Sequence, residues 1–174
     1  MRQPKKLIMA TMSLAMVAAI STVMLTTMLP IGRAVSQLKS QDGDVQRVEA
    51  ATKDFIAAIS ARDIESMDKL WAHEVYATFM GPLCTIIVVG WDGVRKAWEM
   101  RFGQFDGVTI SLAESHVHVN GNVAWAVGVE TVQLLRKDGQ TLGFDTFATN
   151  IFEKHGDRWL VVSHQATPIF RQPK

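Results

Sequence analysis

Apolar residues recur at two different spacings along this chain. Up to about Phe105 they mainly follow helical spacing, interrupted by two short stretches of strand character, Val75–Met80 and Cys84–Val89. After Gly107 the pattern becomes that of long strands only. These strands are expected at Val108–Val119, Val123–Leu135, Leu142–Glu153 and Arg158–Ala166. The turn sequences between them, Asn120-Gly121-Asn122, Lys137-Asp138-Gly139 and His155-Gly156-Asp157, are typical of hairpins and predict an antiparallel meander.

Three helices are expected before the meander. Aspartates are placed to cap each of them: Asp44, Asp63 and Asp92. The buried stripes are predicted to be Val45, Val48, Phe55 and Ile59 in the first helix, Ile64, Met67 and Trp71 in the second, and Val94, Trp98, Phe102 and Phe105 in the third. Strands longer than ten residues coil when helices cover one face, so the sheet should enclose a conical apolar pocket.

The N-terminus differs from the rest of the chain. Arg2, Lys5 and Lys6 precede a run without charge, Leu7–Leu29, which Pro30 ends. We expect residues 1–34 to be either a signal peptide, with Gly32-Arg33-Ala34 as the cleavage site, or an uncleaved membrane anchor, because 23 residues are enough to span a bilayer. Either interpretation places the domain outside the cytoplasm, in the periplasm or beyond, and the anchor would tether it to the inner membrane. Residues 35–44 are expected to form a linker to a domain over residues 45–170.

The charge of the chain limits its possible partners, and its cysteine content limits its possible disulfides. Residues 1–34 hold four of the 18 basic residues and none of the 17 acidic ones, so the remainder has fourteen basic and seventeen acidic residues, a net charge of −3. Nucleic acid is therefore not an expected partner, because phosphate binding needs clustered Lys and Arg. The single cysteine, Cys84, excludes an intramolecular disulfide.

Several segments together resemble SnoaL-like proteins of the NTF2-like superfamily. Gly90–Trp98 is similar to the family's G-W-D-x-V-R-x-A-W helix start, and Val119–Trp125 to its V-x-G-D-x-A-W hairpin; Thr149–Lys154 and Gly156–Val162 resemble its last two strands. The resemblance covers residues 45–170. It implies an α+β, NTF2-like cone: three N-terminal helices packed in a strongly curved antiparallel sheet, here preceded by an N-terminal hydrophobic helix. It also implies a pocket for a small-molecule ligand and, often, a homodimer.

The expected ligand-binding residues are aromatic or polar residues in apolar surroundings: Trp71, Phe79, Trp91, Trp98, Trp125, Asn150, Ser163 and Gln165. For each aromatic a place in the core is the simpler interpretation, but in a cone the core and the pocket lining are nearly the same set. On the last strand, Trp159, Val161, Ser163 and Gln165 share one face, and Leu160, Val162, His164 and Ala166 share the other. Both sets mix apolar and polar residues, so the alternation leaves open which face is inward.

Three residues are candidates for acid–base catalysis. The closing strand of the family is often rich in histidine, and only His164 keeps one here. Glu130 and Asp145 interrupt otherwise apolar strands, and either would have a raised pKa if it pointed inward. His116 and His118 share a strand face, but we expect them on a solvated surface without a third metal ligand. Nucleotide and zinc motifs are missing from the sequence, so we expect no cofactor and no metal.

Three functions follow from these features. We expect an exported domain that binds a small apolar or amphipathic molecule in its cone. The alternative is an enzyme of the isomerase, dehydratase or hydrolase kind, in which His164 acts with Glu130, Asp145 or Asn150. A third interpretation is that the sheet serves self-association only.

Overall fold

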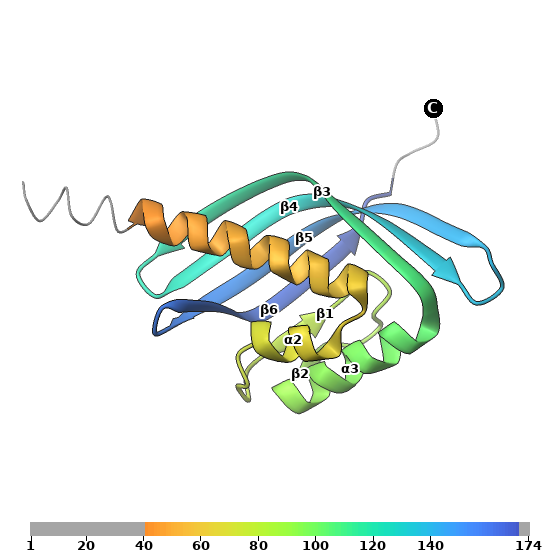
Figure 1. Ribbon diagram of the computed structural model, residues 1–174, viewed down its shortest axis with the longest axis horizontal. Coiled ribbons are helices and arrows are strands. Elements are labelled where there is room, and N and C mark those ends of the chain that lie inside the picture. The colour runs from red at the N-terminus through yellow and green to blue at the C-terminus, as the bar shows by residue number, and fades with distance from the viewer. Residues whose placement is uncertain (1–40, 171–174) are drawn as a thin grey trace, which may run out of the picture. The chain divides into compact units, whose positions relative to one another are not determined.

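The computed structural model describes residues 41–170, and the predicted segment 1–34 lies outside this range. A first helix covers residues 41–61, followed by α2 (Ile64–Leu70) and α3 (Trp91–Gln104). The first helix crosses one face of the long strands, while α2 and α3 lie beside the short strand β1 (Thr78–Met80) (Figure 1). No helix among residues 41–170 combines the length and the hydropathy needed to cross a membrane.

The six strands form one curved, unclosed sheet in the order β2-β1-β6-β5-β4-β3 (Figure 1). β2 (Val88–Val89) pairs with β1, and β1 runs parallel to β6 (Arg158–Pro168). The other pairs, between β3 (Phe105–Asn120), β4 (Val123–Arg136), β5 (Thr141–His155) and β6, are antiparallel. This arrangement confirms the predicted α+β cone of three helices and a curved sheet.

Three local predictions were wrong. The expected strand Cys84–Val89 is reduced to β2, because residues 81–87 form turns and bends. The expected linker is already helical at residues 41–44, so Asp44 lies inside the first helix and does not cap it. Instead the Asp44 carboxylate is buried and accepts hydrogen bonds from Trp159 Nε1 (3.1 Å) and Lys154 Nζ (2.9 Å). Finally, Gly90 rather than Asp92 is the residue at the N-cap of α3, where its φ of 83° suits glycine.

The core lies between the helices and the inner face of the sheet. Phe55 of the first helix packs against Trp71 and Trp98, with ring centroids 6.1 and 5.9 Å apart. The inner positions of β4 hold the small residues Ala124 and Ala126, both buried, which leaves space for these large rings. The helices therefore supply most of the aromatic volume of the core.

Two bulges decide which side chains of the curved strands point inward. In β6 the pairing with β5 shifts at Val162, so that Val161 and His164 both lie on the inner side although they are three residues apart. In β3 the register shifts between Leu112 and Glu114. There the strand comes so close to Gly128 that a side chain on this glycine would collide with the backbone carbonyl of Glu114.

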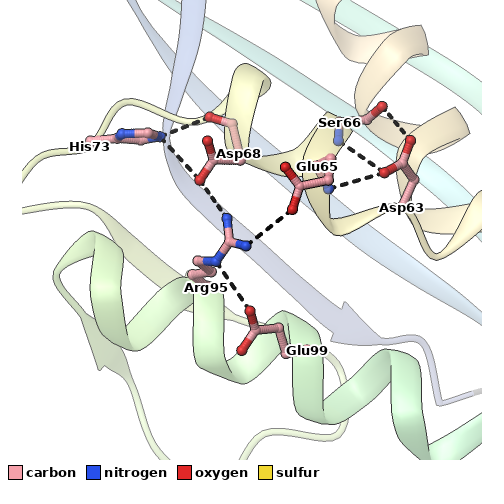
Figure 2. Close-up of polar contacts among 7 residues, drawn as sticks. All are labelled: Asp63, Glu65, Ser66, Asp68, His73, Arg95 and Glu99. Atoms are coloured by element: carbon pink, nitrogen blue, oxygen red, sulfur yellow. Dashed lines mark hydrogen bonds and ion pairs between the residues drawn. The ribbon is translucent and has the colours of Figure 1, made fainter.

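A cluster of charged residues fixes α3 against α2. Arg95 of α3 reaches Asp68 (2.6 Å) and Glu65 (3.3 Å) of α2 and Glu99 on its own helix (3.1 Å), as Figure 2 shows. Next to it, His73 donates from Nε2 to the backbone carbonyl of Asp68 at 2.8 Å. Burial would lower the pKa of Arg95, but the hydrogen bond with Glu65 and the contacts with Asp68 raise it, which keeps the guanidinium charged. The cluster holds α3 in the position from which its other face lines the cavity described next.

Candidate functional site

An apolar cavity opens between α3, the turn after β1 and the inner face of β4 to β6. The volume accessible to the centre of a water-sized molecule is about 70 Å³. This is several times the volume that one water molecule needs. Its walls are mostly aromatic and aliphatic side chains: Ile59, Phe79, Pro82, Leu83, Trp98, Phe102, Phe105, Val108, Ile110, Val132, Leu134, Phe144 and Ala166. Three titratable side chains interrupt these walls: Arg101, Glu130 and His164.

Glu130 is the acidic group of the cavity. It lies in β4, is only 3% exposed, and has no hydrogen bond or ion pair with any residue in the described range. Burial in these apolar surroundings raises the pKa of Glu130 to about 7. Its neighbour across the sheet is Thr146 of β5, which is fully buried and whose Oγ1 also has no partner among residues 41–170. This cross-strand pair thus holds a carboxyl group and a hydroxyl group that have no partner among residues 41–170.

His164 is the second titratable group. Its Nδ1 lies 2.7 Å from Oδ1 of Asn150, the residue opposite it on β5. Because a carbonyl oxygen only accepts, Nδ1 carries the proton and Nε2 keeps its lone pair. Burial and the nearby charge of Arg101 lower the pKa of His164 to about 3, so the ring stays neutral. Phe55, Phe79 and Trp98 surround the ring, with centroids 5.2 to 6.0 Å away.

Arg101 lies on α3, one turn after Trp98. Its guanidinium packs 5.1 Å from the ring centre of Phe79, and its Nη2 donates to Cys84 Sγ at 2.7 Å. Arg101 Nε and Trp98 Nε1 are both buried, and neither has a hydrogen-bond partner among residues 41–170. The cavity can therefore offer donors from α3, a lone pair from His164 and a carboxyl group from Glu130.

Comparison with known families agrees with this architecture. A family model described as the SnoaL-like domain matches residues 48–170. The chain belongs to the SnoaL-like family. No curated protein sequence matches this SnoaL-like chain at a significant level.

Solved structures show the same fold. A candidate dehydratase of the NTF2-like family from Streptomyces avermitilis shares 23% identity, with a TM-score of 0.68 over 75% of this chain and 99% of that one. An NTF2-like superfamily protein from Salmonella enterica serovar Typhimurium shares 20% identity, with a TM-score of 0.67 over 74% of this chain and 92% of that one. A ketosteroid isomerase-like protein from Erwinia carotovora atroseptica shares 16% identity, with a TM-score of 0.63 over 74% of this chain and 98% of that one. These likenesses show that the chain shares the fold of the NTF2-like proteins.

The structure brings together part of the predicted site of the SnoaL-like domain. Phe79, Trp98, Glu130 and His164 line the cavity, and Asn150 supports His164 from the neighbouring strand. The remaining predicted aromatics of the helical half, Trp71 and Trp91, are buried in the core but do not line the cavity. Five of the predicted residues are thus directly connected to one site.

Four other predicted residues lie elsewhere. Trp125 is 37% exposed on the outer face of β4, because the alanines beside it take the inner positions. Ser163 and Gln165 also face outward, since the bulge at Val162 turns His164 inward. Asp145 is half-buried on the outer side of β5, where its Oδ1 accepts a hydrogen bond from the Thr131 hydroxyl at 2.9 Å. None of these four residues lines the cavity.

The histidine pair of β3 lies on the outer face. His116 and His118 are exposed, and His118 packs on Trp125 with 4.6 Å between ring centroids. Within residues 41–170, no three side chains of His, Cys, Asp or Glu are grouped in a way that could hold a metal ion.

Sequence reasoning missed two residues of the site, Arg101 and Thr146. Arg101 follows Trp98 by three residues and therefore lies on the apolar stripe of α3. An arginine in such a position is a signal that could have identified it. Thr146 gave no signal, because threonine is common in strands and only the register shows that it lies opposite Glu130.

Proposed function

We propose that this SnoaL-like domain binds a small, mostly apolar molecule in the cavity and that Glu130 exchanges a proton with it. One observation carries the proposal: Glu130 is 3% exposed, has no partner in the described part of the chain, and has a pKa of about 7. A buried carboxyl group without a partner destabilises the fold. Its presence therefore indicates a functional role for Glu130 and not a structural one. A pKa near neutrality suits a group that both accepts and donates protons.

The arrangement of the other groups supports a redox-neutral reaction. Glu130 and His164 lie on strands separated by β5, with Glu130 level with Pro168, four residues beyond His164. At roughly 3.3 Å per residue and 4.8 Å per strand, their backbones are about 16 Å apart, so they would contact different ends of a ligand. His164 Nε2 would accept a hydrogen bond from the ligand and orient it, and Glu130 would remove a proton from one atom and return it to another. In an isomerisation the proton returns to a different carbon; in a dehydration it goes to the hydroxyl group, whose C–O bond breaks as water leaves. Neither reaction needs an oxidant or a reductant.

The test compares wild-type protein with Glu130→Gln in D2O. Molecules that co-purify with the full-length protein are first identified by mass spectrometry, then incubated with each form. Wild type should incorporate deuterium into the molecule, and Glu130→Gln should still bind it but exchange it at least 100-fold more slowly. Glu114→Gln, a glutamine substitution at an exposed glutamate of β3, is the matched control. Equal exchange by Glu130→Gln would refute the catalytic part and leave a binding protein.

The outer face of the sheet supports a homodimer as a second part of the proposal. Trp125 and Val127 of β4 and Phe147 of β5 lie on this face, and Phe147 is 57% exposed in the single chain. Large apolar side chains gathered on one sheet face are typical of an interface. A second copy of the chain is the partner that fits a SnoaL-like sheet best.

We also propose that the protein is exported, on the basis of the sequence alone. The segment Leu7–Leu29 lies outside the described residues, but its length and the basic residues before it suit a signal peptide or an anchor in the inner membrane. Alkaline phosphatase fused after Lys174 should be active, and activity only of a cytoplasmic reporter would contradict export. Mass spectrometry of the N-terminus would distinguish cleavage after Ala34 from an intact anchor.

A further inference from the structure

Arg101 has no acidic partner although it borders a buried cavity. Among the residues that line the cavity it is the only one with a permanent positive charge. No carboxylate in the described range lies within ion-pair distance of it, and its buried Nε has no hydrogen-bond partner there. Its guanidinium contacts the thiol of Cys84 and the ring of Phe79, neither of which neutralises its charge. A half-buried guanidinium in this state is stabilised by an anion if one can enter.

Arg95, on the same helix, shows what this fold does with an arginine that has a structural role. Its guanidinium contacts the carboxylates of Glu65, Asp68 and Glu99 (Figure 2). The two arginines are six residues apart on α3, so the chain could equally have placed an acidic residue beside Arg101. The contrast indicates that the guanidinium of Arg101 binds a group that does not belong to the chain.

A second donor lies beside Arg101. The indole Nε1 of Trp98, one turn earlier on α3, is also buried without a partner among residues 41–170. Trp98 and Arg101 both line the cavity. Two neighbouring N–H groups without acceptors suit an oxygen-bearing anion, because each N–H is otherwise left unsatisfied.

The charges of the cavity are separated along its length. Arg101 and His164 both pack against the ring of Phe79, at 5.1 and 5.8 Å from its centre, so these two groups lie at the same end of the cavity. The charge of Arg101 and the N–H of Trp98 therefore favour a negative group at this end. His164 Nε2 offers only a lone pair there, and Glu130 offers a carboxyl group.

We propose that the ligand of this cavity is a small apolar acid, whose carboxylate binds Arg101 and Trp98 while its apolar body extends toward Glu130. The inference rests on the proposed ligand binding and specifies the class of ligand. The planar guanidinium suits a carboxylate, since its N–H groups match the two oxygens. In this orientation the reacting part of the ligand lies at the Glu130 end, away from the charged head.

The test uses three pairs of acids and their uncharged amides with the full-length protein: benzoate and benzamide, octanoate and octanamide, indole-3-acetate and indole-3-acetamide. Isothermal titration calorimetry should show that at least one acid binds about 10- to 100-fold more tightly than its amide, the usual effect of a charge-assisted hydrogen bond. This comparison is made in the wild-type protein and depends on no variant.

Arg101→Gln then locates the preference. It should bind the acid as weakly as wild type binds the amide, with affinity for the amide unchanged. Lys96→Gln removes one positive charge from an exposed position on the same helix and should keep the full preference. Arg101→Lys should retain part of it, because the charge remains without the planar geometry.

The possible failures are distinguishable from one another. If acids and amides bind alike, or if the preference survives in Arg101→Gln, the assignment of an acid to Arg101 is overturned while ligand binding stands. If none of the six compounds binds, both the acid preference and the proposed binding of small apolar molecules are contradicted.

Discussion

His164 and Asn150 form a buried hydrogen bond across β5 and β6, with 2.7 Å between Nδ1 of the ring and Oδ1 of the amide. Both residues are at most 4% exposed, so bulk solvent does not reach the bond. The bond fixes the tautomer that leaves Nε2 without a proton. It therefore links the stability of the sheet to the chemistry of the cavity.

Removing Asn150 should test the energetic part of this link. Asn150→Ala leaves the Nδ1 proton of His164 without an acceptor, which we expect to lower the free energy of unfolding by about 1–3 kcal/mol. Urea denaturation measures the loss. Gln165→Ala, at an exposed position next to His164, is the control and should change stability by less than about 0.5 kcal/mol. Equal effects of the two substitutions would contradict the importance of the bond.

The pH dependence of stability should show two opposing contributions. Glu130 has a pKa of about 7 in the folded state against an ordinary value of 4.5, so its contribution to stability is lost as pH rises from 4.5 to 7. His164 has a pKa of about 3 against 6.5, so its contribution is lost as pH falls from 6.5 to 3. Between pH 4.5 and 6.5 the two slopes, each about 1.4 kcal/mol per pH unit, nearly cancel in the wild-type protein.

Single substitutions should reveal each slope. In Glu130→Gln, stability should fall as pH is lowered through this window; in His164→Gln, it should fall as pH is raised. The titration of Asp44 does not overlap with this pH window. Burial raises the pKa of Asp44, but hydrogen bonds from Lys154, Arg47 and Trp159 outweigh the effect of burial and lower the pKa to about 2. Urea titrations at half-unit pH steps provide the measurement, with the double variant as a control that should be flat. Two flat single variants would show that neither group is buried as described.

Two tryptophans should differ strongly in their contribution to stability. Trp98 is 5% exposed and contacts the rings of Phe55, Phe79 and Phe102, so Trp98→Ala should cost about 3–5 kcal/mol. Trp125 is 37% exposed on the outer face, and Trp125→Ala should cost less than about 1 kcal/mol in the monomer. Denaturation of dilute protein measures both. A large loss for Trp125→Ala under these conditions would place its side chain inside the fold.

The proposed homodimer predicts a specific effect of charge on the outer face. Phe147→Glu introduces a carboxylate in the middle of this face and should convert dimer to monomer, observed by sedimentation velocity. Val75→Glu makes the same change at an apolar residue that is 84% exposed in a turn, and it should leave the dimer intact. A wild-type protein that sediments as a monomer would rule out this interface.

Much of the fold was determined by local patterns in the sequence. Helical spacing identified the three helices, and the turn sequences with Asn-Gly, Asp-Gly and His-Gly-Asp placed the three hairpins of the four long strands. These features depend on neighbouring residues only, so a single sequence is enough to read them. The same holds for Glu130 and His164, which stood out as polar residues in apolar strands.

Which side chains point inward was decided by the tertiary structure. The bulge at Val162 inverts the alternation within β6, so that Trp159 and Val161 precede it and His164 and Ala166 follow it on the same inner face. No regular period describes such a strand, which is why both of its faces looked mixed in the sequence. On β4 the small alanines face inward because the rings of the helices fill the space above them, and Trp125 is left outside. Arg101 became part of the site for the same reason: the chemistry of the cavity depends on contacts between distant elements, and these arise only when helix and sheet are packed together.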